Sequence, residues 1–202
     1  KVGEKPKPLK EEIDFILEHA THYLNKKPTY EDVKSVFTGL RPLVKSKNKI
    51  TSAISRDHQI TISTSGLISV IGGKWTTYRK IAEDVLKFIG KKFDINIGKC
   101  KTKDLKLFEY SNVINSYSPK LHPMFDYTEQ DIINAVKHEM CMTVEDALAR
   151  RTRMLFLDVK AAINTAPLVA KIMAKEMGKD ENWVKEQVEK FEDVAKNFVI
   201  NS

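Results

Sequence analysis

The chain is poor in cysteine and has no long apolar segment. Two of its 202 residues are cysteines, Cys100 and Cys141, and their spacing fits neither a metal site nor a disulfide framework. No hydrophobic run approaches the ~20 residues that a membrane-spanning helix needs. We therefore expect neither a disulfide-stabilised secreted domain nor a transmembrane segment, and a reduced cytoplasmic setting is the simplest expectation.

The chain carries an excess of positive charge, with a net charge of +7 and a pI of about 9.2. Most lysines and arginines are scattered through amphipathic segments and interleaved with Asp and Glu. Positive charge concentrates only in residues 1–10, 45–49 and 99–106, and none of these stretches contains the aromatic residues that stack on bases. We therefore predict no nucleic-acid partner, and a basic surface that suits acidic small molecules or anionic lipids.

The first half of the chain predicts a mixture of helix and strand. Thr29 and Asp32 resemble a capping box, and a turn sequence ending at Gly66 separates two β-like segments. We expect helices over residues 11–24 and 76–89 and a short helical turn over residues 29–36. Residues 59–63 and 67–71 are expected to pair as a β-hairpin. Residues 91–118 show no periodicity and are expected to connect two domains.

The second half of the chain has no strand signal. Its apolar residues follow helical spacing, Thr143 and Asp146 form a second capping pattern, Pro167 suits a first helical turn and Gly178 a helix C-cap. The predicted helices span residues 128–140, 144–150, 152–165, 167–177 and 182–199. The fold class is therefore mainly α, with an all-helical C-terminal domain over residues 106–202 and a partial α+β domain over residues 1–105.

The most informative stretch is the sequence Gly72-Gly73-Lys74-Trp75-Thr76-Thr77 between the second strand and the following helix. A strand–Gly-Gly–helix arrangement brings backbone N–H groups and the positive end of a helix toward an anion or a polar ring. Lys74 adds a charge there, and the hydroxyls of Thr76 and Thr77 suit capping. A simple chain reversal would need the same glycines, and the spacings of a dinucleotide fingerprint or a P-loop are absent.

Three cations stand near the predicted strands and this turn: Arg41, Arg56 and Lys74. Arginine binds carboxylate or phosphate through two parallel hydrogen bonds, so two arginines and a lysine suit a small dianionic ligand. Ordinary surface charge or internal ion pairing is the alternative. His138-Glu139 has no second histidine at helical spacing, so we predict no metal site.

Together these motifs resemble those of FAD-dependent glycerol-3-phosphate dehydrogenase, in its C-terminal part. The resemblance rests on Gly39-Leu40-Arg41-Pro42-Leu43, Ser55-Arg56-Asp57-His58, the run from Gly72 to Asp84, and the later sequences Val136-Lys137-His138-Glu139-Met140 and Thr143 to Arg153. It implies oxidation of sn-glycerol 3-phosphate to dihydroxyacetone phosphate, with hydride transfer to FAD and electrons passed to a quinone. Residues 1–105 would then be the remnant of the FAD- and substrate-binding domain.

The resemblance also implies roles for individual residues. Arg41 and Arg56 match the family's substrate-binding arginines, and Lys74 matches the lysine that lies at both flavin and substrate. Lys74 is therefore the expected catalytic residue. The backbone from Gly72 to Thr77 (Gly72, Gly73, Lys74, Trp75, Thr76 and Thr77) is expected to hold the flavin at its pyrimidine end, where negative charge develops on reduction.

The glycine-rich unit that binds the FAD pyrophosphate in this family is missing from the sequence, which starts at Lys1 without Met. We therefore expect a piece of a longer protein that neither retains FAD nor turns over substrate alone. The parent is expected to associate peripherally with the cytoplasmic face of the cell membrane. A glycerol-3-phosphate oxidase using oxygen on the same fold, and a non-catalytic helical interaction module, are the alternative functions.

Overall fold

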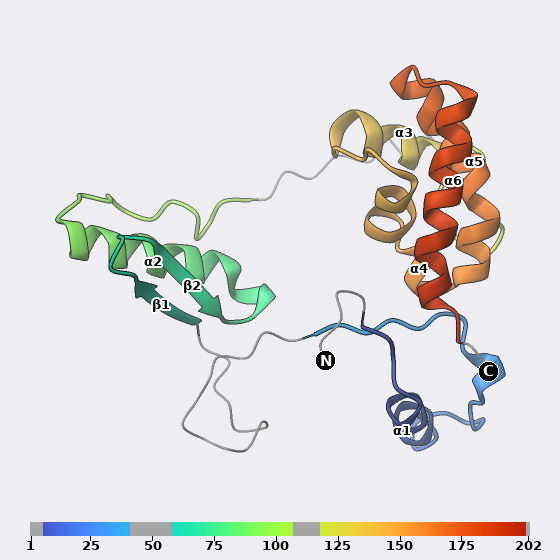
Figure 1. The fold of residues 1–202 in the computed structure, drawn as a ribbon, viewed down its shortest axis with the longest axis horizontal. Coiled ribbons are helices and arrows are strands. Elements are labelled where there is room, and N and C mark those ends of the chain that lie inside the picture. Colours follow the sequence, from blue (N-terminus) through green and yellow to red (C-terminus); the bar gives the residue numbers. More distant parts are fainter. Residues whose placement is uncertain (1–5, 41–57, 107–117, 201–202) are drawn as a thin grey trace. The chain divides into compact units, whose positions relative to one another are not determined.

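The computed structural model describes residues 6–40, 58–106 and 118–200. The chain divides into two compact units, one formed by Lys1–Gly39 with Val113–Ser202 and the other by Leu40–Asn112. We call them the helical unit and the hairpin unit, and describe each by itself (Figure 1). A mainly α fold, as the sequence predicts, is confirmed.

The hairpin unit contains two antiparallel strands and one long helix. Strands β1 (His58–Ile62) and β2 (Ile68–Gly72) pair with His58 opposite Gly72 and Ile62 opposite Ile68. The short helical turn η3 (Trp75–Thr77) leads into α2 (Tyr78–Phe93), which contacts β1. The predicted hairpin and the helix that follows it are confirmed, with α2 continuing past Gly90 to an αL C-cap at Asp94.

The hairpin unit has a thin interior. No residue of β1, β2 or α2 is fully buried, although alternate residues of β1 are half-buried. Beyond α2 the chain runs back along the helix as an irregular segment, and Ile95 donates its N–H to the carbonyl of Gly90 at 3.0 Å. Gly90 is required there because a Cβ would lie 2.6 Å from Ile97 Cγ1 and 2.9 Å from the Ile95 carbonyl oxygen.

The helical unit contains every fully buried residue of the described chain. Its elements are α1 (Lys10–Ala20), η1 (Tyr30–Asp32), α3 (Glu129–His138), η4 (Asp146–Arg151), α4 (Met154–Leu157), α5 (Val159–Met177), α6 (Glu181–Ala195) and η5 (Lys196–Phe198). Figure 1 shows α5 and α6 side by side, with α3 against α5. The core between them consists of fully buried apolar side chains, the largest being Phe191, Ile132, Leu148, Met154, Leu155 and Met173.

Helix α5 differs from its prediction. The sequence predicts two helices that meet at Pro167, but one helix runs from Val159 to Met177 with Pro167 inside it. The actual break lies earlier, at Asp158, whose extended backbone ends α4 and whose Oδ1 accepts the N–H of Ala161 at 3.0 Å. The free energy gained by burying apolar side chains along α5 offsets the cost of the backbone hydrogen bond that Pro167 removes. The predicted C-cap at Gly178, with φ +64°, is confirmed.

The N-terminal segment is bound to the helical unit through an extended stretch after η1. Val36 donates its N–H to the carbonyl of Phe198 at 2.9 Å, and Ser35 Oγ donates to the carbonyl of Leu155 at 2.7 Å. The ring of Phe37 meets Phe156 edge-on, with centroids 5.0 Å apart. The helical unit is therefore discontinuous in sequence, whereas the hairpin unit is one continuous stretch. The predicted boundary at residue 105 separates the remnant of the FAD- and substrate-binding domain from the helical C-terminal domain, and it stays a prediction.

Helix α1 is shorter than predicted, ending at Ala20, and none of its residues is buried. The Thr29–Asp32 capping box forms as predicted: Asp32 Oδ2 accepts the N–H of Thr29 at 2.8 Å and its hydroxyl at 3.1 Å. The turn that it starts covers only Tyr30–Asp32, because the backbone becomes extended at Val33.

Candidate functional site

The turn between β2 and α2 has the predicted strand–Gly-Gly–helix layout. Gly72 and Gly73 both have positive φ, at 80° and 83°, and Lys74 has an extended backbone just before η3. The carbonyl of Lys74 accepts the N–H of Thr77 at 3.0 Å. The two glycines therefore reverse the chain, and Lys74 occupies the N-cap of the helical segment that follows.

A side chain at Gly73 would collide with its surroundings. A Cβ there would lie 2.7 Å from Ile81 Cδ1 and 3.3 Å from His58 Cβ. The inner side of the turn is thus closed by β1 and α2, and the positive φ also disfavours any other residue. Only the outer side of the turn is available to a ligand.

The hydroxyls of Thr76 and Thr77 do not cap this helical start. No side chain caps η3 or α2, and Thr77 Oγ1 instead donates to the carbonyl of Lys74 at 2.9 Å. The prediction of threonine capping is therefore wrong, because the extended Lys74 places its carbonyl within reach of the hydroxyl. The N–H groups of Trp75 and Thr76 donate no hydrogen bond to any described residue, so within the described part of the chain the turn has two open donors.

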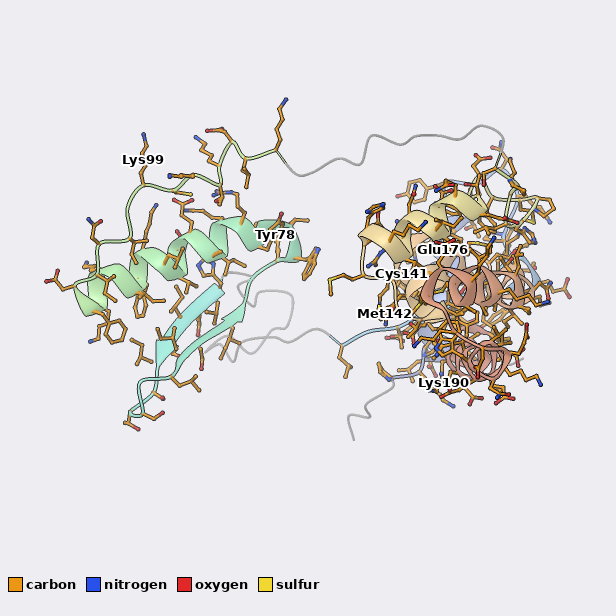
Figure 2. The ribbon with its side chains drawn as sticks, turned by 90° about the horizontal axis from the view of Figure 1, so that it is seen from above. Tyr78, Lys99, Cys141, Met142, Glu176 and Lys190 are labelled. Carbon is orange, nitrogen blue, oxygen red and sulfur yellow. The ribbon has the colours of Figure 1, made fainter. Side chains whose placement is uncertain are left out.

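The outer side of the turn is exposed. Trp75 is 89% and Tyr78 56% exposed, with ring centroids 6.4 Å apart, and Lys74 is also exposed. Figure 2 shows Tyr78 at the start of α2. Exposed large aromatics beside open N–H donors and a lysine form a surface that suits a planar, partly anionic ligand.

The structure brings together the predicted residues from Gly72 to Thr77 because they are contiguous. The two predicted phosphate-binding arginines, Arg41 and Arg56, lie outside the described residues. Their proximity to Lys74 therefore stays a prediction.

A network of charges on α2 lies next to the turn and was not singled out from the sequence. Glu83 binds Arg79 Nη1 at 3.1 Å and also Lys87, while Asp84 Oδ1 binds Lys80 Nζ at 2.7 Å. The hydrogen bonds from Lys87 and Arg79 lower the pKa of Glu83 to about 2. The i,i+4 spacing of these residues is the signal that could have predicted the network.

A cavity of about 370 Å³ lies further along α2, beneath the irregular segment that contains Cys100. The thiol of Cys100 is exposed, and hydrogen bonding by Thr102 lowers its pKa. Arg79 Nη1 lies 3.8 Å from the sulfur. Lys99, on the same segment, points outward in Figure 2.

In the helical unit, the arginines of the Arg150-Arg151-x-Arg153 sequence support local structure. Arg150 binds Glu145 at 2.6 Å and Asp146 at 2.9 Å, and Arg151 Nε binds Glu139 Oε2 at 3.1 Å. Asp146 also completes the second predicted capping box, which is confirmed. Among the described residues, no group of three or more His, Cys, Asp or Glu side chains is placed to hold a metal ion.

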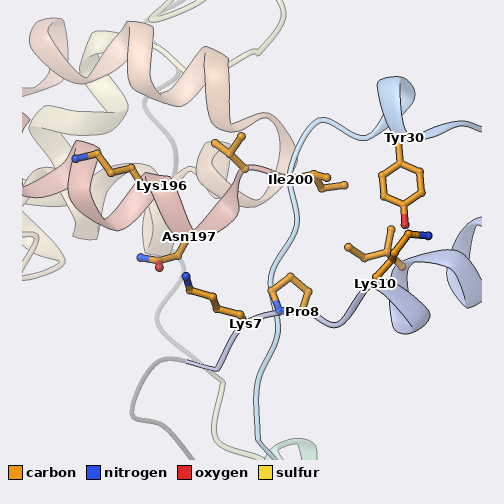
Figure 3. Close-up of a pocket in the computed structure, with 9 residues that line it drawn as sticks. Lys7, Pro8, Lys10, Tyr30, Lys196, Asn197 and Ile200 are labelled. Carbon is orange, nitrogen blue, oxygen red and sulfur yellow. The ribbon is translucent and has the colours of Figure 1, made fainter. Parts of the chain in front are cut away.

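A second cavity, of about 300 Å³, lies between residues 7–13 with Tyr30 on one side and residues 196–200, in and after η5, on the other (Figure 3). Lysines line it, but their charges are largely matched: Lys10 binds Asp14 at 2.8 Å and Lys196 binds Asp193 at 2.6 Å. The hydroxyl of Tyr30 also donates to Asp14, at 2.6 Å. No sequence motif pointed to this cavity, and three of its polar side chains, Lys10, Tyr30 and Lys196, are already bound to carboxylates beside it.

No helix in the described part of the chain has the length and apolar character to cross a bilayer.

Comparisons with known proteins identify relatives over most of the chain. Residues 100–184 match the family described as the C-terminal domain of alpha-glycerophosphate oxidase. A probable mitochondrial glycerol-3-phosphate dehydrogenase of Dictyostelium discoideum is 32% identical over 219 aligned positions, covering 85% of this chain and 34% of that protein. The human mitochondrial glycerol-3-phosphate dehydrogenase is 30% identical over 234 positions, covering 93% of this chain and 32% of that protein.

These alignments are longer than the 202 residues of this chain, so the relatives carry additional residues inside the matched region. A solved structure with the same fold is the glycerol-3-phosphate dehydrogenase from Bacillus halodurans complexed with FAD. Its TM-score is 0.67 at 24% identity, covering 97% of this chain and 46% of that one. The chain spans about a third of the length of its curated relatives. By these matches, residues 100–184 resemble the C-terminal domain of alpha-glycerophosphate oxidase, and most of the chain is similar to glycerol-3-phosphate dehydrogenases.

Proposed function

We propose that this chain supplies one wall of the flavin and substrate site of an FAD-dependent enzyme that oxidises sn-glycerol 3-phosphate to dihydroxyacetone phosphate. The observation that carries this proposal is the exposed turn at Gly72–Gly73, which presents Lys74 and two open N–H donors in a chain similar to glycerol-3-phosphate dehydrogenases. The relatives' names supply the substrate, and the Bacillus halodurans structure contains FAD.

The residues at the turn fit a flavin. The glycines close its inner side against Ile81 and His58, so a ring system can approach the backbone only from outside. The N–H groups of Trp75 and Thr76 would donate to acceptors on the polar edge of the ring, and Lys74 would place a positive charge nearby. When bound, FAD would supply the acceptor for the hydride that leaves C2 of the substrate.

The chain's own residues would orient the substrate and stabilise charge. Lys74 would interact with the reacting end of the substrate, and Arg41 with Arg56 would bind its phosphate through paired hydrogen bonds. A dianionic phosphate held at one end would fix the C2 alcohol relative to the turn, and this positioning would raise the rate.

The test is single-turnover flavin reduction in the full-length protein. Addition of glycerol 3-phosphate is expected to bleach the flavin of the wild type, and Lys74→Ala is expected to slow that bleaching by roughly 10²–10³-fold. Lys92→Ala, an exposed lysine in the last turn of α2, is the matched control and should leave the rate unchanged. A normal rate in Lys74→Ala would reject the site and favour a non-catalytic interaction module.

The electron acceptor is proposed to be a quinone. The match to a domain described from alpha-glycerophosphate oxidase is the observation that favours oxygen instead. Reduction of a soluble quinone analogue without peroxide formation would support the dehydrogenase, and stoichiometric peroxide would support the oxidase.

We further propose that the whole protein associates peripherally with a membrane, through surfaces rather than a spanning helix of the described residues. The relatives named above are mitochondrial, whereas the motifs of the sequence imply the cytoplasmic face of the cell membrane. Release from membranes by salt or carbonate would support the peripheral mode.

The chain alone is expected to bind FAD negligibly, and co-elution of a stoichiometric flavin with it on gel filtration would contradict this.

A further inference from the structure

A polar contact joins the first residue of β1 to the middle of α2. His58 Nε2 lies 3.5 Å from Asp84 Oδ2, and the two side chains are 22% and 29% exposed. The other oxygen of Asp84 binds Lys80 Nζ at 2.7 Å. Asp84 therefore contacts an exposed lysine of its own helix through one carboxylate oxygen and faces His58 of the strand with the other.

His58 also lies against the Gly72–Gly73 turn. It pairs with Gly72 in the strand register, and its Cβ is 3.3 Å from the position that a Cβ on Gly73 would occupy. From the opposite direction Ile81 of α2 closes on Gly73. The turn is thus held between a residue of β1 and a residue of α2.

The turn is fixed at its other end by Lys74 itself. The carbonyl of Lys74 accepts two hydrogen bonds from Thr77, one from its N–H and one from its hydroxyl. The turn from Gly72 to Lys74 therefore connects the hairpin of β1 and β2 to α2 along the chain. The contact between Asp84 and His58 joins the hairpin to α2 a second time. Movement of β1 relative to α2 would displace Lys74.

We propose that His58 and Asp84 form a positioning pair for Lys74. They act by holding the strand end against α2, without contacting the substrate. The inference rests on the role proposed above for Lys74. Because a displacement of about 1 Å in a reacting group can cost up to about 100-fold in rate, a loosened turn should slow flavin reduction more than it weakens substrate binding.

The test uses the full-length protein with His58→Ala, Asp84→Ala, their double variant and Asp84→Asn. Each alanine variant is expected to lower the rate of flavin reduction by glycerol 3-phosphate roughly tenfold, with a smaller change in KM. The double variant should be no slower than the slower single one, because both remove the same contact. Asp84→Asn retains volume and an acceptor oxygen, so it should recover part of the rate.

Hydrogen exchange provides a readout that does not depend on activity. The backbone amides of residues 72–77 should exchange faster in the alanine variants than in the wild type. Lys80→Ala is the matched control, because it removes the other partner of Asp84 and leaves the contact with His58. It should leave both exchange and rate unchanged.

Three results would overturn the inference: unchanged exchange in the alanine variants, faster exchange with a normal rate, or fully additive effects in the double variant. A wild-type protein whose flavin is not reduced by glycerol 3-phosphate would instead reject the proposed function. In that case, the exchange data alone would decide whether the pair holds the turn.

Discussion

Removal of the Asp146 side chain should measurably destabilise the helical unit. Its Oδ2 accepts the N–H of Thr143 at 3.0 Å, the hydroxyl of Thr143 at 2.8 Å and the N–H of Met142 at 3.2 Å. Thr143 Oγ1 in turn accepts the N–H of Asp146 at 3.0 Å. One carboxylate therefore satisfies most donors at a turn that begins next to the fully buried Val144.

The magnitude follows from these contacts. Loss of a capping side chain costs about 1–2 kcal/mol of unfolding free energy. The ion pair with Arg150 adds at most about 0.5 kcal/mol, because the arginine side chain is 52% exposed. Asp146→Ala should therefore lower the unfolding free energy by about 2 kcal/mol, measured from the midpoint of urea denaturation at an unchanged slope.

The effect should depend on pH. Burial of Asp146 would raise its pKa, but the hydrogen bonds from Thr143 and Met142 and the charge of Arg150 outweigh it and hold the pKa below its ordinary value of 3.8. A depressed folded-state pKa contributes stability above the unfolded-state pKa and loses it as the pH falls through the folded value. The difference between wild type and variant should therefore be full near pH 6 and shrink below about pH 4.

Asp126→Ala is the matched control, since Asp126, like Asp146, pairs with a basic side chain (Lys120) but is itself fully exposed. It should stay within about 0.5 kcal/mol of the wild type. If Asp146→Ala behaved like this control, or if its effect grew as the pH fell, the assignment of stability to the capping carboxylate would be refuted.

Two further predictions concern the cysteines and the packing of Ile97 against Gly90 of α2. At neutral pH, a thiol reagent followed by mass spectrometry should modify Cys100 rapidly and Cys141 only on unfolding. Cys100 is exposed, whereas burial raises the pKa of Cys141 to about 11, so equal rates would contradict the structure. Gly90→Ala should destabilise the hairpin unit despite its gain of about 1 kcal/mol in helix propensity, because the new Cβ would overlap Ile97. An increase in helical circular dichroism and in stability would show that the segment containing Ile97 does not pack against Gly90.

The features that the sequence predicted are local. The hairpin, the glycine turn and the Gly178 C-cap each depend on the conformational preferences of a few neighbouring residues, so a short pattern suffices to identify them. The same holds for the capping box of Thr143 and Asp146, in which two side chains three residues apart satisfy each other.

The features that the sequence missed depend on tertiary contacts. The sequence predicts a helix start at Pro167, but packing of α5 against α3, α4 and α6 keeps the helix continuous. The contact between His58 and Asp84 joins residues 26 positions apart, and neither residue has a local pattern that points to the other. At the site itself, the order of motifs indicated Lys74, while the open donors of Trp75 and Thr76 became evident only from the backbone geometry.

In the described chain, the buried core and the candidate site lie in different units. The helical unit contains the core, and the hairpin unit contains the candidate site at the turn. Every fully buried residue belongs to the helical unit, whereas the strands and α2 of the hairpin unit bury none completely. An isolated two-stranded hairpin is marginally stable in water, so the geometry of β1 and β2 depends on packing against α2 and on contacts such as that between His58 and Asp84. The exposed Trp75 and Tyr78 are the surface through which a ligand would add burial to this unit. Binding at the turn would therefore stabilise the hairpin unit by mass action, and the position of Lys74 and the occupancy of the site would be coupled.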